Sequence, residues 1–221
     1  MTSVVDAPAD HVAAPLRLST SMQRNIAIVA PPWYPVPPHG YGGIESVVAL
    51  LVEELRTRGH RVTLLAAEGS EHRAVVHAPV AWRADLGQRE ERLRELTYAA
   101  GCLEIISRRG PFDVIHDHVG FATLLGCVRL GVAPVLHTVH GAIHEPDASF
   151  YSALGDDLSL VAISASQRRP TPELSWIGTV PNAVPLRQLM VGRPEDKEAY
   201  LLCLARICPD KGQHLAIEVA R

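Results

Sequence analysis

Apolar and polar positions alternate along this chain in a pattern that predicts strands followed by helices. Residues 26–30 form a continuous apolar run, which is typical of a buried strand. After a proline-rich loop, apolar residues recur at helical spacing between residues 44 and 55, and Gly59 follows as a stop signal. A second apolar run covers residues 61–67. Strand, helix and strand of this length predict a βαβ unit with a right-handed crossover.

The same alternation continues to residue 180. Further strands are predicted at residues 74–80, 112–116, 134–139, 158–163 and 176–180, and further helices at residues 88–109, at 121–130 and from Ser164 onward. In the longest helix, the residues expected to face inward are Leu93, Leu96, Ala100 and Leu103. Strands that are apolar nearly throughout predict a parallel sheet covered on both faces. The fold class is therefore α/β, with a doubly wound, Rossmann-like domain over residues 25–184.

The two ends of the chain do not follow this pattern. Residues 1–24 mix Ala, Pro, Ser and Asp and are expected to be a disordered tail, and the polar residues 185–198 are expected to be a linker. An apolar run at 200–205 and a helix from Gln213 then restart the alternation. A single βα unit cannot bury its own strand, so residues 199–221 are interpreted as the start of an incomplete second Rossmann-like domain.

Composition narrows the class of protein. The chain has 221 residues, 47% hydrophobic and 20% charged, with a formal net charge of −3. These values are typical of a globular protein, and nothing in them favours a nucleic-acid partner. No apolar run approaches the roughly 18 residues that a spanning helix requires. The four cysteines show no CxxC spacing and lie in apolar patterns, which predicts reduced, buried thiols in a cytoplasmic protein.

The loop that follows the first predicted strand has candidate binding chemistry. Gly42 and Gly43 fall at the start of a predicted helix, where free backbone N–H groups and the helix dipole favour an anion such as a phosphate. The segment has neither GxGxxG spacing nor a following GK[ST]. Glu45 fits a first-turn residue that the dipole favours. Trp33 and Tyr34 fit either loop packing or a sugar-stacking surface.

Histidines follow two of the predicted strands. In a parallel sheet, ligands bind outside the carboxyl ends of the strands, and His118 and His140 both fall there. Each is either a hydrogen-bonded structural residue or part of a site. His137 is expected to be structural, because it alternates to the side opposite Thr138.

A zinc site is the alternative interpretation of these histidines. His116 and His118 share one side of an extended chain, with Asp117 and His140 close in the pattern, and such ligands suit zinc. A lone HxH motif is a weak signal, so a metal is the less favoured interpretation. Arg206 and Lys211 flank a turn between a strand end and a helix start. They fit an anion contact better than a solvated surface pair.

Taken in order, these segments resemble the retaining GT-B glycosyltransferases of family 4, the group 1 glycosyl transferases. The segments that carry the resemblance are GYGGIE (40–45), DVIHDH (113–118), VLHTVHG (135–141), LVAISAS (160–166), VPNAV (180–184) and LLCLARICPDKG (201–212). The resemblance extends from residue 26 to residue 221. It identifies the first predicted domain as similar to a GT-B N-terminal domain and the last βα unit as similar to the start of the donor-binding domain.

The resemblance implies a nucleotide-diphospho-sugar donor, no metal and no cofactor. In such enzymes Gly42 and Gly43 would approach the donor phosphates. Arg206 and Lys211 would neutralise the diphosphate leaving group, which stabilises charge that grows in the transition state. His140 would lie beside the reacting sugar as the catalytic residue.

The acceptor side follows from the same resemblance. His118, Tyr41 and Glu45 would line the acceptor site. The acceptor would be a sugar, a lipid or another small molecule; no nucleic acid is expected, and nothing indicates a membrane surface.

The chain departs from the family pattern at two points. Ala205 replaces the glycine that usually precedes the arginine, which is a mild change. The family's E-x7-E pair and nucleoside pocket would lie beyond residue 221, so this chain by itself is expected to be inactive or impaired. Two other functions remain open: a non-catalytic acceptor- or partner-binding module, and a zinc hydrolase built on His116, His118 and His140.

Overall fold

The computed structural model describes residues 23–71, 75–77, 88–186, 189–190, 192–205, 207–208 and 211–221. Contacts divide the chain into two units, Met1–Val184 and Pro185–Arg221. Most of the predicted tail, residues 1–22, lies outside the described residues. Gln23 and Arg24 are described, and both hydrogen-bond to the turn that precedes the second strand, at Gly59 and His60.

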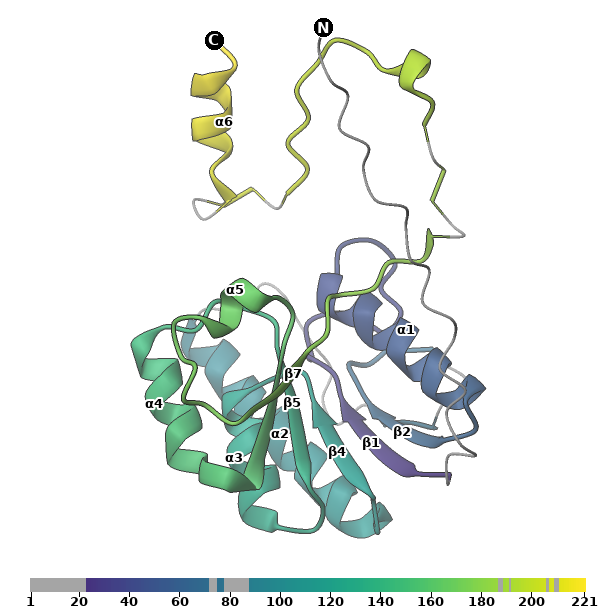
Figure 1. Cartoon of the computed structure of the whole chain (residues 1–221). Helices are drawn as coiled ribbons and strands as arrows, with labels where there is room; N and C mark the ends of the chain where they lie inside the picture. Colours follow the sequence, from purple (N-terminus) through teal and green to yellow (C-terminus); the bar gives the residue numbers. More distant parts are fainter. Residues whose placement is uncertain are drawn as a thin grey trace, which may run out of the picture. The chain divides into compact units, whose positions relative to one another are not determined.

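The first unit contains a seven-stranded, parallel sheet with the order β3-β2-β1-β4-β5-β6-β7 (Figure 1). Its strands are β1 (Asn25–Val29), β2 (Arg61–Leu65), β3 (Val75–His77), β4 (Val114–Asp117), β5 (Val135–Val139), β6 (Leu158–Ala162) and β7 (Trp176–Thr179). All seven coincide with predicted strands to within a few residues. The α/β, Rossmann-like fold class is confirmed for this unit.

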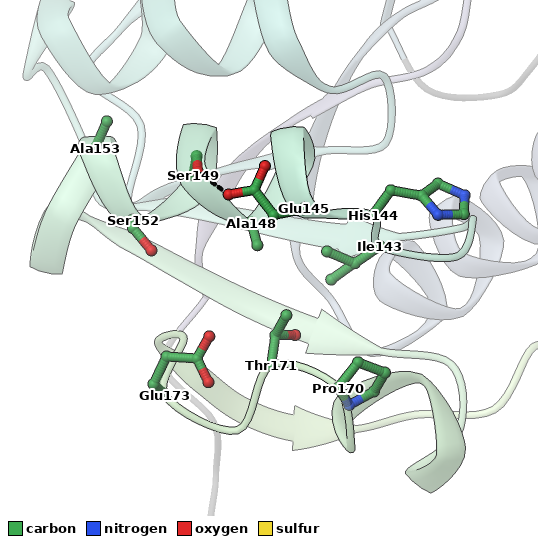
Figure 2. Close-up of a pocket in the computed structure, with 10 residues that line it drawn as sticks. All are labelled: Ile143, His144, Glu145, Ala148, Ser149, Ser152, Ala153, Pro170, Thr171 and Glu173. Atoms are coloured by element: carbon green, nitrogen blue, oxygen red, sulfur yellow. Dashed lines mark hydrogen bonds between the residues drawn. The ribbon is translucent and has the colours of Figure 1, made fainter.

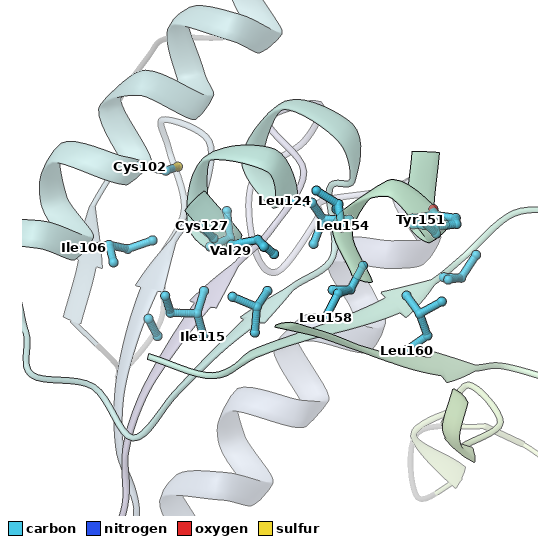
Figure 3. Packing of buried hydrophobic residues seen from close by; sticks show 14 of the residues in the cluster. Val29, Cys102, Ile106, Ile115, Leu124, Cys127, Tyr151, Leu154, Leu158 and Leu160 are labelled. Carbon is cyan, nitrogen blue, oxygen red and sulfur yellow. The ribbon is translucent and has the colours of Figure 1, made fainter. Parts of the chain in front are cut away.

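Helices cover both faces of the sheet. On one face, α1 (Gly43–Thr57) packs Val48 and Val52 against β1 and β2 residues such as Ile28. The other face carries α2 (Gln88–Arg109), α3 (Phe121–Leu130) and α4 (Glu145–Leu154). Figure 3 shows this second core, where side chains from the three helices meet those of the strands. Alternate residues of β1 serve the two cores, because successive strand side chains point to opposite faces.

The buried face of α2 agrees with the predicted one only at Leu103, which is partly buried against the core, whereas Ala100 is exposed. Leu93 and Leu96 are 54% and 56% exposed. The buried residues are instead Tyr98, Ala99, Cys102 and Ile106. Tyr98 can be buried because its hydroxyl donates to the carbonyl groups that end β1 and β2, at 2.7 Å from Ala30 O and 3.0 Å from Leu65 O. The leucine spacing alone could not reveal that partner.

Helix α4 (Glu145–Leu154) is not among the helices predicted from the sequence. Its start carries a recognisable signal, because Pro146 lies in its first turn and the Asp147 carboxylate accepts from the His144 backbone N–H at 2.9 Å. A short 3₁₀ turn (Gly155–Asp157) then leads into β6. The predicted short helix from Ser164 is present as α5 (Ala165–Arg168), with the Ser164 hydroxyl accepting from Gln167 N–H.

In the unit Pro185–Arg221, the predicted strand at residues 200–205 is wrong. These residues have no regular structure, because a strand requires hydrogen bonds from a neighbouring strand and the described part of this unit offers none. The helix predicted from Gln213 is present as α6 (Gln213–Val219), after a 3₁₀ turn at Pro194–Asp196. The apolar side chains of the expected strand are largely exposed, namely Tyr200, Leu201, Leu202 and Leu204.

The absent strand also changes the environment of the cysteines. All four thiols are free, as predicted. Cys102 and Cys127 are buried in the core, where burial raises the pKa of Cys102 well above its usual range and that of Cys127 to about 12. Cys203, by contrast, is exposed. Among the described residues, no helix has the length and apolarity needed to cross a lipid bilayer.

Candidate functional site

The loop between β1 and α1 ends in a tightly packed turn at Gly42, the N-cap of α1. The φ angle of Gly42 is 152°, and an added Cβ would lie 2.7 Å from the Pro38 Cβ. The Gly42 carbonyl accepts from the backbone N–H and the hydroxyl of Ser46, at 2.9 and 2.8 Å. Gly43, the first residue of the helix, is exposed and has open space where a side chain would be. The N-terminus of a 15-residue helix is thus bare of side chains at Gly43.

Glu45 is buried beneath this loop, only 3% exposed. Burial raises the pKa of its carboxyl, while hydrogen bonds from its own backbone N–H and that of Tyr34 act in the opposite direction. Tyr34 contacts Tyr41 edge-on, with ring centroids 5.7 Å apart, and Tyr41 is 57% exposed. The carboxylate of Glu45 therefore holds the loop onto α1, and Tyr41 is the accessible member of the group. Their roles toward an acceptor remain predictions.

His118 and His140 lie at the carboxyl ends of β4 and β5 and form a direct pair. Nδ1 of His118 and Nε2 of His140 are 2.9 Å apart, and the two rings stack with centroids 5.2 Å apart. Burial lowers the pKa of His140 to about 4 and that of His118 well below its ordinary value. Both rings are therefore neutral at pH 7, and the hydrogen bond requires one to donate and the other to accept.

The outer nitrogens of this pair, Nε2 of His118 and Nδ1 of His140, are buried and have no hydrogen-bond partner among the described residues. Because one inner nitrogen donates and the other accepts, one outer nitrogen carries a proton and the other carries a lone pair. The pair can consequently offer one donor and one acceptor.

His116 has a different partner. Its Nε2 lies 2.9 Å from the Thr138 hydroxyl of the neighbouring strand, and burial lowers its pKa to about 4. The centroids of the His116 and His118 rings are 4.2 Å apart. In the described part of the chain, no group of three or more His, Cys, Asp or Glu side chains is arranged to hold a metal ion.

Asp117, His137 and Tyr151 form a buried hydrogen-bond network beside the histidine pair, which the sequence pattern does not predict. His137 is 3% exposed, as expected of a structural residue, and its Nδ1 lies 2.9 Å from Asp117 Oδ1. Its Nε2 lies 3.4 Å from the hydroxyl of Tyr151, on the missed helix α4. Asp117 is fully buried and also accepts from the backbone N–H groups of Val119 and Gly120.

His118, His140, His137 and Tyr151 line a cavity of about 360 Å³ at the carboxyl ends of β4 and β5. Ile44, in the first turn of α1 next to Gly43, lines the same cavity as His118 and His140. The remaining polar lining includes Thr138 and Asp147. The start of α1 and the two histidines are therefore neighbours around one cavity, at the sheet edge where ligands of doubly wound folds bind.

A larger cavity of about 800 Å³ lies between α4 and the segment that precedes β7 (Figure 2). Its polar lining includes Glu145, Ser149, Ser152, Thr171 and Glu173. The Glu145 carboxylate accepts from the Ser149 hydroxyl at 3.1 Å. None of the residues selected from the sequence lines this cavity, so the smaller cavity is the candidate site.

The two predicted cations belong to the second unit. Arg206 lies outside the described residues. Lys211 is exposed and precedes Gly212, the N-cap of α6. Their contact with a phosphate remains a prediction.

Known proteins that are similar to this chain include one family and two solved structures. A family model described as Glycosyltransferase Family 4 matches residues 41–172, more than half of the chain. The solved structure of AviGT4, a glycosyltransferase involved in avilamycin A biosynthesis, shares 26% sequence identity with a TM-score of 0.44, over 74% of this chain and 44% of that one. A glycosyltransferase from Rickettsia africae ESF-5 shares 16% identity with a TM-score of 0.51, over 71% of this chain and 42% of that one.

The chain thus spans less than half of the length of either solved structure. Among curated proteins, none matches this chain.

Proposed function

The chain belongs to glycosyltransferase family 4, and on this premise we propose that it supplies the acceptor side of a retaining glycosyltransferase. The reaction would transfer a sugar from a nucleotide-diphospho-sugar to a sugar, lipid or small-molecule acceptor. The observation that carries the proposal is the cavity that Ile44, His118 and His140 line together, inside the segment that the family model matches. The proposal includes neither a metal nor a cofactor.

Three groups have roles in this proposal. The exposed N-terminus of α1 at Gly43, with Gly42 shaping the turn, would meet the donor phosphates through backbone N–H groups and the helix dipole. Arg206 and Lys211 would stabilise the charge of the departing diphosphate. His140, at the cavity wall, would contact the reacting sugar. A neutral imidazole suits that contact, because it can exchange hydrogen bonds with a hydroxyl group without carrying a charge.

His118 would act mainly through His140. The 2.9 Å hydrogen bond between the two rings fixes the orientation of His140 and couples the protonation of one ring to that of the other. We therefore assign to His118 the positioning of His140, in addition to its contact with the acceptor.

Sugar transfer by the chain is the direct test. The chain is mixed with UDP-, GDP- or ADP-linked sugars and a panel of acceptors, and products are identified by mass spectrometry, with anomeric configuration from proton NMR. Transfer with retained configuration supports the proposal, and inverted products would contradict it. Arg206→Ala and Lys211→Ala should each lower the rate about a hundredfold, the usual effect of removing one transition-state contact. Lys197→Ala, which removes another exposed cation of the same unit, is the matched control.

The second function, a non-catalytic acceptor-binding module, is favoured by one observation: the residues that line the cavity all belong to the unit Met1–Val184. An acceptor that binds while every donor remains unconsumed would establish this function for the chain. The expectation that the chain alone is inactive or impaired stays a prediction, which the same assay tests.

A further inference from the structure

The hydrogen-bond chain Asp117–His137–Tyr151 has no part in the roles assigned above, yet it ends on the wall of the candidate cavity. In its first hydrogen bond, between His137 and Asp117, the donor can be assigned. His137 Nδ1 faces two oxygens, Asp117 Oδ1 at 2.9 Å and the Asp117 backbone carbonyl at 3.1 Å. The carbonyl can only accept, and Oδ1 already accepts from the N–H groups of Val119 and Gly120. Nδ1 of His137 must therefore carry the proton.

The second link follows from the first. In a neutral imidazole with its proton on Nδ1, Nε2 has only a lone pair. The Tyr151 hydroxyl, 3.4 Å away, then donates to His137. Burial raises the pKa of Tyr151 to about 12, so this hydroxyl keeps its proton at neutral pH. With that proton directed at His137, the Tyr151 oxygen has only lone pairs left for a ligand.

The rest of this wall has matching chemistry. The Asp147 carboxylate, which also lines the cavity, is another group that accepts hydrogen bonds. Phe121 is 51% exposed on the same wall, and its ring is nearly parallel to that of Tyr151, at 18° and 6.3 Å between centroids. Phe150 supports it from the side at 5.1 Å. An exposed ring beside fixed acceptors suits a ligand with an apolar face and hydroxyl groups at its edge.

An anionic ligand is disfavoured on this wall, because the Asp147 carboxylate and the Tyr151 lone pairs would face it. The volume of about 360 Å³ falls within the range of roughly 300–1,000 Å³ for small-ligand sites. We propose that Tyr151, oriented by Asp117 and His137, is a specificity-determining residue that accepts a hydrogen bond from a hydroxyl group of a neutral, hydroxylated ring lying against Phe121. This inference rests on the proposed function in so far as that ring is the acceptor.

The donor and acceptor roles in the hydrogen bonds from Tyr151 to His137 and from His137 to Asp117 can be tested without a ligand. In protein labelled with ¹⁵N-histidine, the NMR shifts of His137 should report a proton on Nδ1 and a bare Nε2. Tyr151→Phe removes the donor to Nε2 and should move that resonance, while Nδ1 stays protonated. A proton on Nε2, or an Nε2 shift unchanged in Tyr151→Phe, would overturn the inference.

Binding is tested with methyl α-glycosides of glucose, galactose and mannose, and with glucose 6-phosphate as the charged probe. At least one neutral glycoside should shift the His137 and Phe121 signals, and Tyr151→Phe should weaken that binding about fivefold to tenfold, the effect of one lost hydrogen bond. Tyr98→Phe is the matched control, because it removes a buried hydroxyl that donates to the Ala30 and Leu65 carbonyls, and Tyr98 does not line the cavity. It should leave glycoside binding unchanged.

Three results would refute the proposal: no binding of any neutral glycoside, tighter binding of glucose 6-phosphate, or equal binding by Tyr151→Phe and the unaltered chain. These outcomes are distinct from failure of the proposed function. Glycoside binding together with sugar transfer that inverts the anomeric configuration would remove only the proposed retaining transfer. Sugar transfer with an acceptor KM that Tyr151→Phe leaves unchanged would remove only the inference about Tyr151.

Discussion

At the scale of single residues, the two glycines at the start of α1 are needed for different reasons. Gly42 has a positive φ angle, and Pro38 occupies the space where its side chain would lie. Gly43 has neither constraint, and nothing lies within 4 Å of an added Cβ. The sequence shows only two adjacent glycines, so this difference could not be derived from it. Gly42 therefore shapes the loop, whereas Gly43 keeps its backbone accessible.

Gly42→Ala should therefore destabilise the chain by about 1–3 kcal/mol, because the new Cβ strains the backbone and must displace Pro38. Gly43→Ala should leave stability unchanged or raise it by up to about 1 kcal/mol, since alanine is the better helix former. Urea unfolding of both variants measures the difference. Equal losses of stability would contradict the packing described for Gly42.

The buried histidines predict a stability that falls in mild acid. Burial lowers the pKa of both His116 and His140 to about 4, whereas an unfolded histidine titrates near 6.5. Between those values the unfolded chain binds protons that the folded chain does not, so folding stability is complete above pH 6.5 and is lost as the pH falls toward 4. Each such histidine contributes a slope of at most about 1.4 kcal/mol per pH unit.

The measurement is urea unfolding at steps between pH 7 and pH 5. His116→Asn should reduce the slope, because it removes one of the groups that must stay neutral in the folded state. His214→Asn, which changes an exposed histidine of α6, is the control and should retain the slope of the unaltered chain. A slope that His116→Asn leaves untouched would show that other groups cause the acid sensitivity.

At the scale of elements, the sequence predicted strands well and the packing of helices less well. Apolar runs located every strand of the sheet, because a strand buried on both faces has a simple pattern. The inward face of α2 was wrong in part. Leu103 packs against the core as expected, but the largest buried residue is Tyr98, whose burial depends on the carbonyl groups of Ala30 and Leu65. Helix α4 was missed because its signals are a capping box and a first-turn proline rather than an apolar stripe.

The corrected face of α2 predicts unequal effects of two substitutions. Tyr98→Phe leaves the Ala30 carbonyl without the hydroxyl that donates to it and should cost about 1–3 kcal/mol of folding stability. Leu96→Ala should change stability by less than about 0.5 kcal/mol, because the side chain is 56% exposed. Thermal or urea unfolding compares them. A larger loss for Leu96→Ala would restore the originally predicted face.

At the scale of the whole molecule, some residues of the candidate site could be predicted from the order of strands along the sequence, and others could not. His118 and His140 could be expected at one sheet edge, because both end strands of a parallel sheet. Their direct hydrogen bond depends on β4 and β5 being adjacent, which follows from the strand order. Tyr151 could not be found, since the helix that presents it was not predicted. The two predicted cations lie in the unit Pro185–Arg221, whose expected strand did not form.

The division into two units predicts that the first folds by itself. Both hydrophobic clusters consist of residues between Ile26 and Trp176. In Pro185–Arg221, by contrast, Leu202, Leu204 and Ile207 are 73%, 90% and 92% exposed. A shortened chain that ends at Val184 should therefore unfold in one cooperative transition. Its free energy of unfolding should lie within about 0.5 kcal/mol of the value for the same unit in the 221-residue chain.

The shortened chain should also associate less, because exposed apolar side chains of Pro185–Arg221 are removed with that unit. Light scattering at matched concentrations measures this difference. A chain that ends at Arg168 is the control for the boundary: it loses β7 and the buried Leu174, and its stability should fall sharply. If the chain that ends at Val184 were equally destabilised, the second unit would have to support the first, and the cavity beside His118 and His140 could no longer be treated as a property of Met1–Val184 alone.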